Sequence, residues 1–257
     1  MKLSSSEQVN QRIKSSVEVD RRDTDLPCAS SGEVNLSSKA VSQLHKNRLR
    51  PSTGENDQES EYKLENFMIG PLLAISKMLE LHDPYTAGHE KRVGIVARDI
   101  AIEMGWSEGR AKLLELIGLV HDVGKIALPI EILTKPTRLS PIEMELVRTH
   151  TDAGYEILKN LTFPVPLAEI VREHHERLDG SGYPHKLKGD QILLEARIIA
   201  VADVLESMAT QRPYRKALGI EAALEELTKN RGTLYDSEVV DAITRLFRDK
   251  AYQLPAY

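Results

Sequence analysis

The chain is poor in cysteine and in aromatic residues, and each shortage excludes a class of protein. Its 257 residues contain one cysteine, Cys28, so neither an internal disulfide nor a site built from several thiolates can form. Phe, Trp and Tyr together make up 5% of the residues, which favours helix packing over a β-sandwich. Any bound metal must therefore be held by histidine and carboxylate side chains.

The sequence also lacks long apolar runs and an excess of basic residues. No stretch approaches the roughly 18 apolar residues of a membrane span, and Met1-Lys2-Leu3 is followed by three serines instead of the apolar core of a signal peptide. The formal net charge is -5, whereas a protein that binds DNA or RNA polymers needs a surplus of Lys and Arg. We therefore expect a cytoplasmic protein that binds no nucleic acid polymer, although a small anionic substrate fits if positive charge is local.

The pattern of apolar residues divides the chain into two parts. Residues 1–60 are polar with scattered apolar residues, which predicts a disordered or linker tail; a short helix at about 40–49 is the alternative. Residues 61–257 carry apolar residues at intervals of three and four, without the alternation of β-hairpins, and predict one all-α domain. The expected helices span about 62–81, 86–105, 107–122, 166–176, 193–210, 220–229 and 237–250, and another starts at Ser140, where Pro141 and Glu143 complete a capping pattern.

Several polar residues fall where these helices should bury apolar side chains. A single histidine in such a place is more often a satisfied core residue than a ligand, but five of the eight histidines share this feature. Two aspartates join them without a Lys or Arg on the same helical stripe, and an unpaired buried carboxylate is costly. A shared metal centre resolves these costs, and seven donors suit two ions bridged by a carboxylate, for which we expect Asp122. The predicted ligands are His89, His121, Asp122, His150, His174, His175 and Asp203.

Four segments of the sequence carry a family resemblance. They are HDVGK at 121–125, HHERLDGSGYP at 174–184, DPYTAGHEKRV at 83–93 and ADVLESMATQRPYR at 202–215. In this order they resemble the HD-GYP family of the HD superfamily, and the similarity extends over about residues 62–250. The resemblance implies a helical bundle of the HD superfamily with a metal site in its core.

The resemblance also implies an activity. HD-GYP proteins are bacterial signalling phosphodiesterases that hydrolyse cyclic di-GMP to pGpG, and in some members to GMP, with two or three ions that are commonly iron or manganese. All seven predicted ligands match those of the family. By this match Asp122 bridges the ions and is catalytic, with His89, His121 and Asp203 on one ion and His150, His174 and His175 on the other.

The resemblance assigns substrate contacts as well. Lys125 resembles the catalytic lysine that contacts the scissile phosphate, and Arg212 and Arg215 resemble basic residues that hold the substrate's phosphates. Arginines near a helix end also have a structural explanation, because they offset the helix dipole. The residue types at Gly182, Tyr183 and Pro184 are typical of a tight turn. The family match implies that they shape the mouth of the site, contact the substrate and bind diguanylate cyclase domains of the GGDEF type.

The sequence departs from the family pattern in three places. Trinuclear members carry a glutamate where this chain has Tyr85, so we expect two metal ions. Glu206 and Ser207 stand where an aspartate and an alanine are common, and the loop after Pro184 differs from the usual sequence.

Two other functions remain as alternatives. One is an HD phosphohydrolase for another nucleotide, and the other is a catalytically silent signalling or binding module, although none of the seven ligands is lost. The sequence leaves open the native metal, the end product and whether two copies pair through the first helix.

Overall fold

The computed structural model describes residues 55–83, 88–210 and 217–255, all within one compact unit. These residues form helices and no β-strand, apart from an isolated bridge between Arg231 and Tyr235, which confirms the all-α prediction. The expected tail up to residue 54, as well as Tyr85, Arg212 and Arg215, lies outside the described residues.

The helices follow one another with short connections. Their order is α3 (Glu55–His82), α4 (His89–Glu103), α5 (Glu108–Gly118), the 3-10 helix η2 (Val123–Ala127), α6 (Ile130–Leu133), α7 (Pro141–Arg148), α8 (His150–Leu158), α9 (Leu167–Glu173), the 3-10 helix η3 (Gly189–Gln191), α10 (Leu194–Ala209), α11 (Ile220–Lys229) and α12 (Ser237–Asp249). None of the helices in the described part of the chain is both long and apolar enough to cross a membrane.

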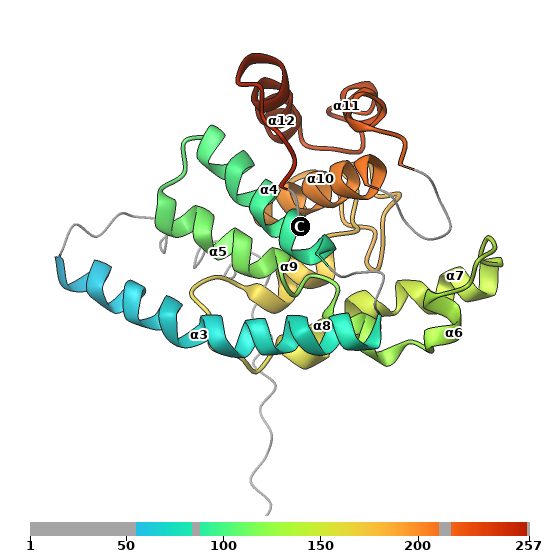
Figure 1. The fold of residues 1–257 in the computed structure, drawn as a ribbon, viewed down its shortest axis with the longest axis horizontal. Coiled ribbons are helices and arrows are strands. Elements are labelled where there is room, and N and C mark those ends of the chain that lie inside the picture. The colour runs from blue at the N-terminus through green and yellow to red at the C-terminus, as the bar shows by residue number, and fades with distance from the viewer. Residues whose placement is uncertain (1–54, 84–87, 211–216, 256–257) are drawn as a thin grey trace, which may run out of the picture. The chain divides into compact units, whose positions relative to one another are not determined.

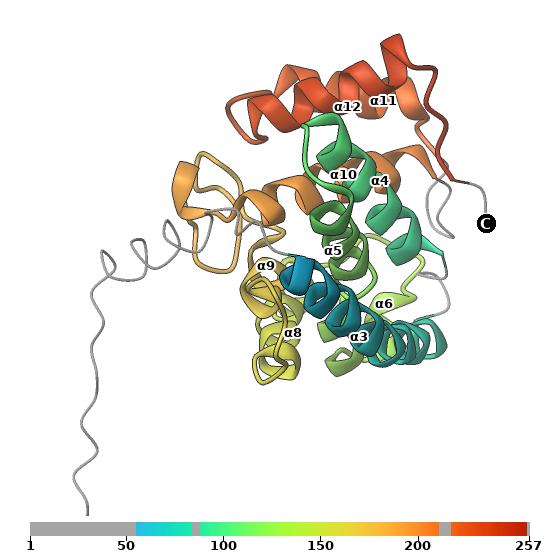
Figure 2. The same ribbon diagram turned by 90° about the vertical axis from the view of Figure 1, so that its left-hand side faces the viewer.

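The helices are stacked around α4, α5 and α10. In both views α11 and α12 lie on one side of these three helices, and α3, α8 and α9 lie on the other (Figures 1 and 2). The core contains fully buried aliphatic side chains from every one of the three central helices, such as Ile100, Ile117 and Ile199. A continuous apolar core of this kind holds the ends of many helices in fixed positions.

Local signals set several helix ends as predicted. Ser140 and Glu143 form a reciprocal capping box at the start of α7, with Pro141 at the first helical position. Ser107 caps α5, and Gly105 follows the end of α4 with a φ of 84°, which favours glycine. The expected bounds of 220–229 match α11.

Other boundaries differ from the prediction. The first helix begins at Glu55, before the expected start near residue 62. The helix expected over 107–122 ends at Gly118, because the chain turns there and continues into η2. The helix that starts after Ser140 breaks at Thr149, so α8 was not predicted as a separate helix. Because of this break, Leu146 on α7 is 39% exposed whereas His150 on α8 is buried.

Two pairs of glycines allow the backbones to approach closely. A Cβ atom on Gly118 would lie 2.3 Å from Gly94 Cα, so α5 and α4 contact each other through their backbones. A Cβ atom on Gly124 would lie 1.8 Å from the carbonyl oxygen of His150 and 2.5 Å from the amide nitrogen of Gly154, which places η2 directly on α8. These contacts bring together segments that adjoin His89, Asp122 and His150.

The contact of η2 with α8 gives a prediction about stability. Gly124→Ala should lower the free energy of unfolding of the metal-free protein by about 1–3 kcal/mol, because the new methyl group must displace backbone atoms. Gly70→Ala is the matched control: nothing lies within 4 Å of the added methyl group in α3, and alanine should stabilise that helix by roughly 0.5–1 kcal/mol. Urea denaturation measures both changes, and an unaffected Gly124→Ala protein would contradict this packing.

Candidate metal centre

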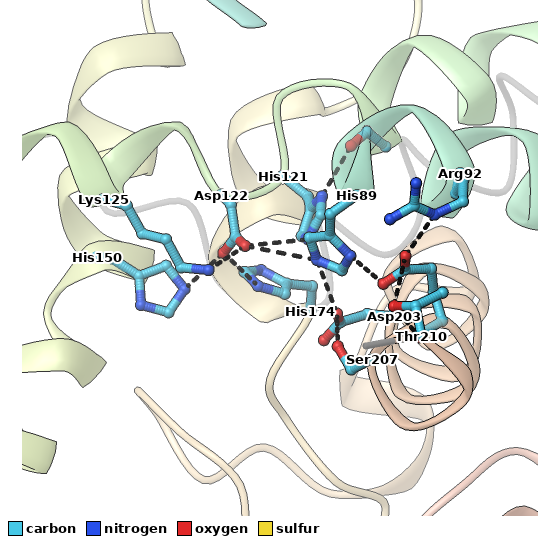
Figure 3. Close-up of polar contacts among 12 residues, drawn as sticks. His89, Arg92, His121, Asp122, Lys125, His150, His174, Asp203, Ser207 and Thr210 are labelled. Carbon is cyan, nitrogen blue, oxygen red and sulfur yellow. Dashed lines mark hydrogen bonds and ion pairs between the residues drawn. The ribbon is translucent and has the colours of Figure 1, made fainter. Parts of the chain in front are cut away.

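The structure brings all seven predicted ligands together in two groups. The donor atoms of Asp122, His150, His174 and His175 lie within 4.8 Å of one another, and so do those of His89, His121 and Asp203. Figure 3 shows six of these side chains converging from separate segments of the chain. These residues lie far apart in the sequence, and the helix packing described above brings them together.

Each ligand occupies a defined place on the fold, mostly at a helix end. His89 is the first residue of α4, His150 is the first residue of α8, and His174 follows the last residue of α9. His121 and Asp122 lie in the turn between α5 and η2. Asp203, in contrast, projects from the middle of α10. Helix ends allow side chains from several directions to reach one point.

Asp122 lies between the two groups. Its Oδ1 atom is 3.3 Å from His150 Nε2 and 3.8 Å from His174 Nε2. Its Oδ2 atom is 3.4 Å from His121 Nε2 and 3.9 Å from His89 Nε2. The two oxygens of one buried carboxylate thus face different sets of imidazoles, which is the arrangement of a bridging ligand.

Hydrogen bonds to the main chain orient three of the imidazoles. The Nδ1 atoms of His121, His150 and His174 lie 2.7, 2.6 and 2.5 Å from the carbonyl oxygens of Gly118, Val147 and Val171. A carbonyl oxygen can only accept, so each Nδ1 carries the proton and each neutral ring keeps a free lone pair on Nε2. Main-chain contacts therefore select the tautomer that a metal ion requires.

The atoms that face the centre lack other partners. The Nε2 atoms of His121, His150 and His174, together with Asp122 Oδ1, are buried without a hydrogen bond. Buried polar atoms of this kind are rare in native proteins, because each one loses its hydration without compensation. Four such atoms around one point, on neutral imidazoles and a carboxylate, fit divalent metal ions of the iron, manganese or zinc type.

Electrostatics favours the ligand forms of these groups. Burial lowers the pKa of His174 to about 3 and holds the pKa values of His121 and His175 below the ordinary histidine value. Burial acts to raise the pKa of Asp122, but the charge of Lys125 opposes it, and that pKa lies well below its usual range. The rings of His121, His174 and His175 are thus neutral and the carboxylate of Asp122 is ionised near pH 7.

Lys125, which the sequence predicted as a substrate contact, lies beside Asp122. Its ammonium group forms an ion pair with Asp122 Oδ2, one turn earlier in the chain, and only 14% of the Lys125 side chain is exposed (Figure 3). A partly buried ammonium beside this carboxylate adds positive charge at the edge of the ligand cluster, where it could stabilise an anionic group.

The segment from Gly182 to Pro184 forms a wall beside the histidine pair. The Tyr183 ring lies 4.8 Å from the His175 ring, centroid to centroid, and the Tyr183 amide donates to the His175 carbonyl oxygen at 3.3 Å. A Cβ atom on Gly182 would lie 2.5 Å from that same oxygen. The buried Glu176 carboxylate accepts hydrogen bonds from the amides of His185, at 2.7 Å, and Leu187, at 3.1 Å. The loop is therefore fastened to the chain that carries the ligands.

Sequence reasoning missed two buried acidic residues beside the centre. Glu90 is 1% exposed, its carboxylate oxygens have no hydrogen-bond partner, and burial raises its pKa to about 7. Glu206 was noted only as a departure from the family pattern, but it is fully buried next to His89. Its position three residues after Asp203 places both carboxylates on one face of α10, and this spacing was the available signal.

Comparisons with known proteins agree with this geometry. A family model described as HD domain matches residues 74–239. A cyclic di-GMP phosphodiesterase response regulator, RpfG, of Xanthomonas campestris is 41% identical over 176 residues, which cover 68% of this chain and 47% of that protein. A 3'3'-cGAMP-specific phosphodiesterase of Vibrio cholerae is 37% identical over 185 residues, which cover 71% of this chain and 40% of that protein. The chain thus spans half or less of the length of these relatives.

Solved structures share the fold. A HDGYP protein from Bdellovibrio bacteriovorus superimposes with a TM-score of 0.55 at 15% sequence identity, over 82% of this chain and 78% of that one. At this identity the likeness concerns the fold alone. Since the HD domain model matches well over half of the sequence, the chain belongs to the HD domain family, which confirms the resemblance carried by its motifs.

Proposed function

We propose that this protein is a metal-dependent phosphodiesterase that hydrolyses cyclic di-GMP to pGpG in bacterial signalling, and the test below shows whether a second cleavage gives GMP. The observation that carries the proposal is the buried Asp122 carboxylate: one oxygen faces His121 and the other faces His150 and His174, and the Nε2 atoms of these three rings are buried without a hydrogen bond. The printed name of the Xanthomonas relative supports the choice of substrate. The catalytic domain is assigned to residues 61–257, around the HD match, and the protein to the cytoplasm.

Two divalent ions, iron or manganese, fit the ligand set. His89, His121 and Asp203 would hold one ion, His150, His174 and His175 the other, and Asp122 both. Such a pair, when bound, supplies an acidified water as nucleophile and neutralises charge on the phosphate. We do not propose a third ion, since this chain has Tyr85 where trinuclear members of the family carry a glutamate.

The residues of the chain have separate tasks in this mechanism. Lys125 exchanges its contact with Asp122 for one with a phosphate oxygen and stabilises the charge that develops there. Arg212 and Arg215 are assigned to the second phosphate, because guanidinium groups bind phosphate with forked hydrogen bonds. Tyr183 and Pro184 close one side of the site, and Gly182 lets the loop approach His175.

A second substrate has a specific observation in its favour. One relative at 37% identity is named for 3'3'-cGAMP, and the histidine and aspartate donors around Asp122 suit metal ions and do not select a base. The same centre would therefore cleave either cyclic dinucleotide, and the residues around its rim would choose between them. The silent-module alternative is weaker, because all seven ligands are present and the unpartnered atoms converge.

The first test is hydrolysis itself. Protein purified anaerobically and loaded with Fe(II) or Mn(II) should convert cyclic di-GMP to pGpG or GMP, as followed by chromatography. Asp122→Asn should reduce the rate about 100-fold or more and lower the metal content, because the bridging charge is lost. Asp241→Asn, on the surface of α12, should change neither.

Two results would reassign the function. If the protein carries about two metal ions, leaves cyclic di-GMP intact and cleaves 3'3'-cGAMP, then 3'3'-cGAMP is its substrate. A protein that takes up no metal ion under these conditions is a binding module.

The role of Lys125 gives a separate prediction. Lys125→Met should lower kcat about 100- to 1,000-fold, the usual effect of removing one group that stabilises transition-state charge, while both metal ions stay bound. Metal analysis together with steady-state kinetics distinguishes this catalytic role from a role of Lys125 in assembling the metal centre. In the second case the metal content would fall in parallel with the rate. Lys125→Arg, which keeps the charge, should retain part of the activity.

The loop of Gly182, Tyr183 and Pro184 gives a prediction about binding of a GGDEF domain. Replacing Gly182, Tyr183 and Pro184 together by other residues should abolish pull-down of a diguanylate cyclase domain of the GGDEF type, because the loop would leave its place against His175. Asp190→Ala, at a fully exposed carboxylate beyond the loop, is the control and should not affect binding. Undiminished capture by the triple variant would remove this partner from the proposal.

A further inference from the structure

The imidazole of His89 is held differently from three of its neighbours in the centre. His121, His150 and His174 direct Nδ1 to a main-chain carbonyl three residues earlier. His89 Nδ1 instead donates to Oε2 of Glu206, a carboxylate that lies 117 residues further along the chain. A carboxylate is a stronger acceptor than a carbonyl group and makes the opposite nitrogen of the ring a stronger metal ligand.

The Glu206 carboxylate is itself fixed by other side chains. Arg92 Nε donates to its Oε1 atom at 2.6 Å, and the Thr210 hydroxyl donates to the same oxygen at 3.0 Å. Both oxygens are thereby satisfied, which a carboxylate with 0% exposure requires. These hydrogen bonds form a chain from Arg92 through Glu206 to His89, and Figure 3 shows the side chains of Arg92, Thr210 and His89 around this point. Such a network leaves the imidazole a single orientation.

The network connects two helices through residues one turn apart. Arg92 follows His89 by three positions on α4, and Glu206 follows Asp203 by three positions on α10, so each ligand and its support share one helix face. Ser207 adds to the arrangement, since its hydroxyl donates to Asp203 Oδ1 at 3.0 Å. Two ligands of one half of the centre, His89 and Asp203, thus depend on side chains at the contact between α4 and α10, whereas the imidazoles of His121, His150 and His174 are held by the main chain.

We infer that Glu206, braced by Arg92 and Thr210, is a positioning residue that selectively sets the affinity of the metal ion held by His89, His121 and Asp203. The ion held by His150, His174 and His175 does not depend on it, because the Nδ1 atoms of His150 and His174 are bound within their own segments. This inference rests on the proposed two-metal centre, but not on the identity of the substrate.

The test is a metal titration of the full chain. Equilibrium dialysis against Mn(II), with metal analysis, should give two bound ions for the parent protein. Glu206→Gln preserves the size of the side chain but removes its charge, and should weaken one ion 10- to 100-fold while the affinity of the other stays unchanged. Electron paramagnetic resonance gives a second readout: the coupled spectrum of a bridged pair should change to that of a single ion. Glu206→Asp should restore part of the lost affinity.

Two further variants make the result decisive. Glu226→Gln, on a partly buried carboxylate that accepts from Asn230 on the far side of the domain, should leave both ions bound. Thr210→Val removes one hydrogen bond to Glu206 without a change of charge, and should weaken the same ion several-fold; it decides the question if Glu206→Gln does not fold. Equal affinities in variant and parent, or equal loss of both ions from a folded variant, would overturn the inference. A parent protein that binds no ions would instead overturn the proposed function.

Discussion

The ionised carboxylate of Asp122, enclosed by imidazoles in the interior of a helical domain, is the constraint on which the rest of the structure depends. Its side chain is 3% exposed, and its negative charge is balanced within the described residues by the ammonium group of Lys125. To surround one carboxylate, the chain must bring segments from α4, α5, α8, α9 and α10 to one point. The backbone contacts at Gly118 and Gly124 make that approach sterically feasible.

This constraint explains why apolar periodicity predicted the helices but not all of their ends. The ends of α5 and α8 are set by the turn that carries His121 and by the break at Thr149, and neither is marked by a strong capping residue. Both depend on the packing of η2 against α8, a contact between segments far apart in the sequence that local propensity does not encode. Ser140, in contrast, marks the start of α7 through contacts with its own next turn, and that end was predicted correctly.

The donors of the site were easier to predict than their supports. Seven polar residues at apolar positions are visible in the sequence, because the cost of burying them needs a common explanation. Glu206 has a comparable position on α10, but its partner His89 lies on another helix, and nothing local distinguishes a supporting carboxylate from a ligand. Glu90 was missed for the same reason, since its burial results from the packing around α4. Supports of this kind become visible only when the helices are assembled.

The predicted metal ligands and the residues that would contact the bases are different, and this separation bears on substrate specificity. In the proposed function the donor atoms around Asp122 hold metal ions and Lys125 contacts a phosphate oxygen, and every cyclic dinucleotide offers such a phosphate. A guanine and an adenine differ at their edges, several bonds away from the phosphate that is attacked. Under this proposal, selection between cyclic di-GMP and 3'3'-cGAMP would come from residues around the centre and not from the metal ligands. A change of preferred base would then leave the buried ligands undisturbed, which agrees with relatives of both names at 41% and 37% identity.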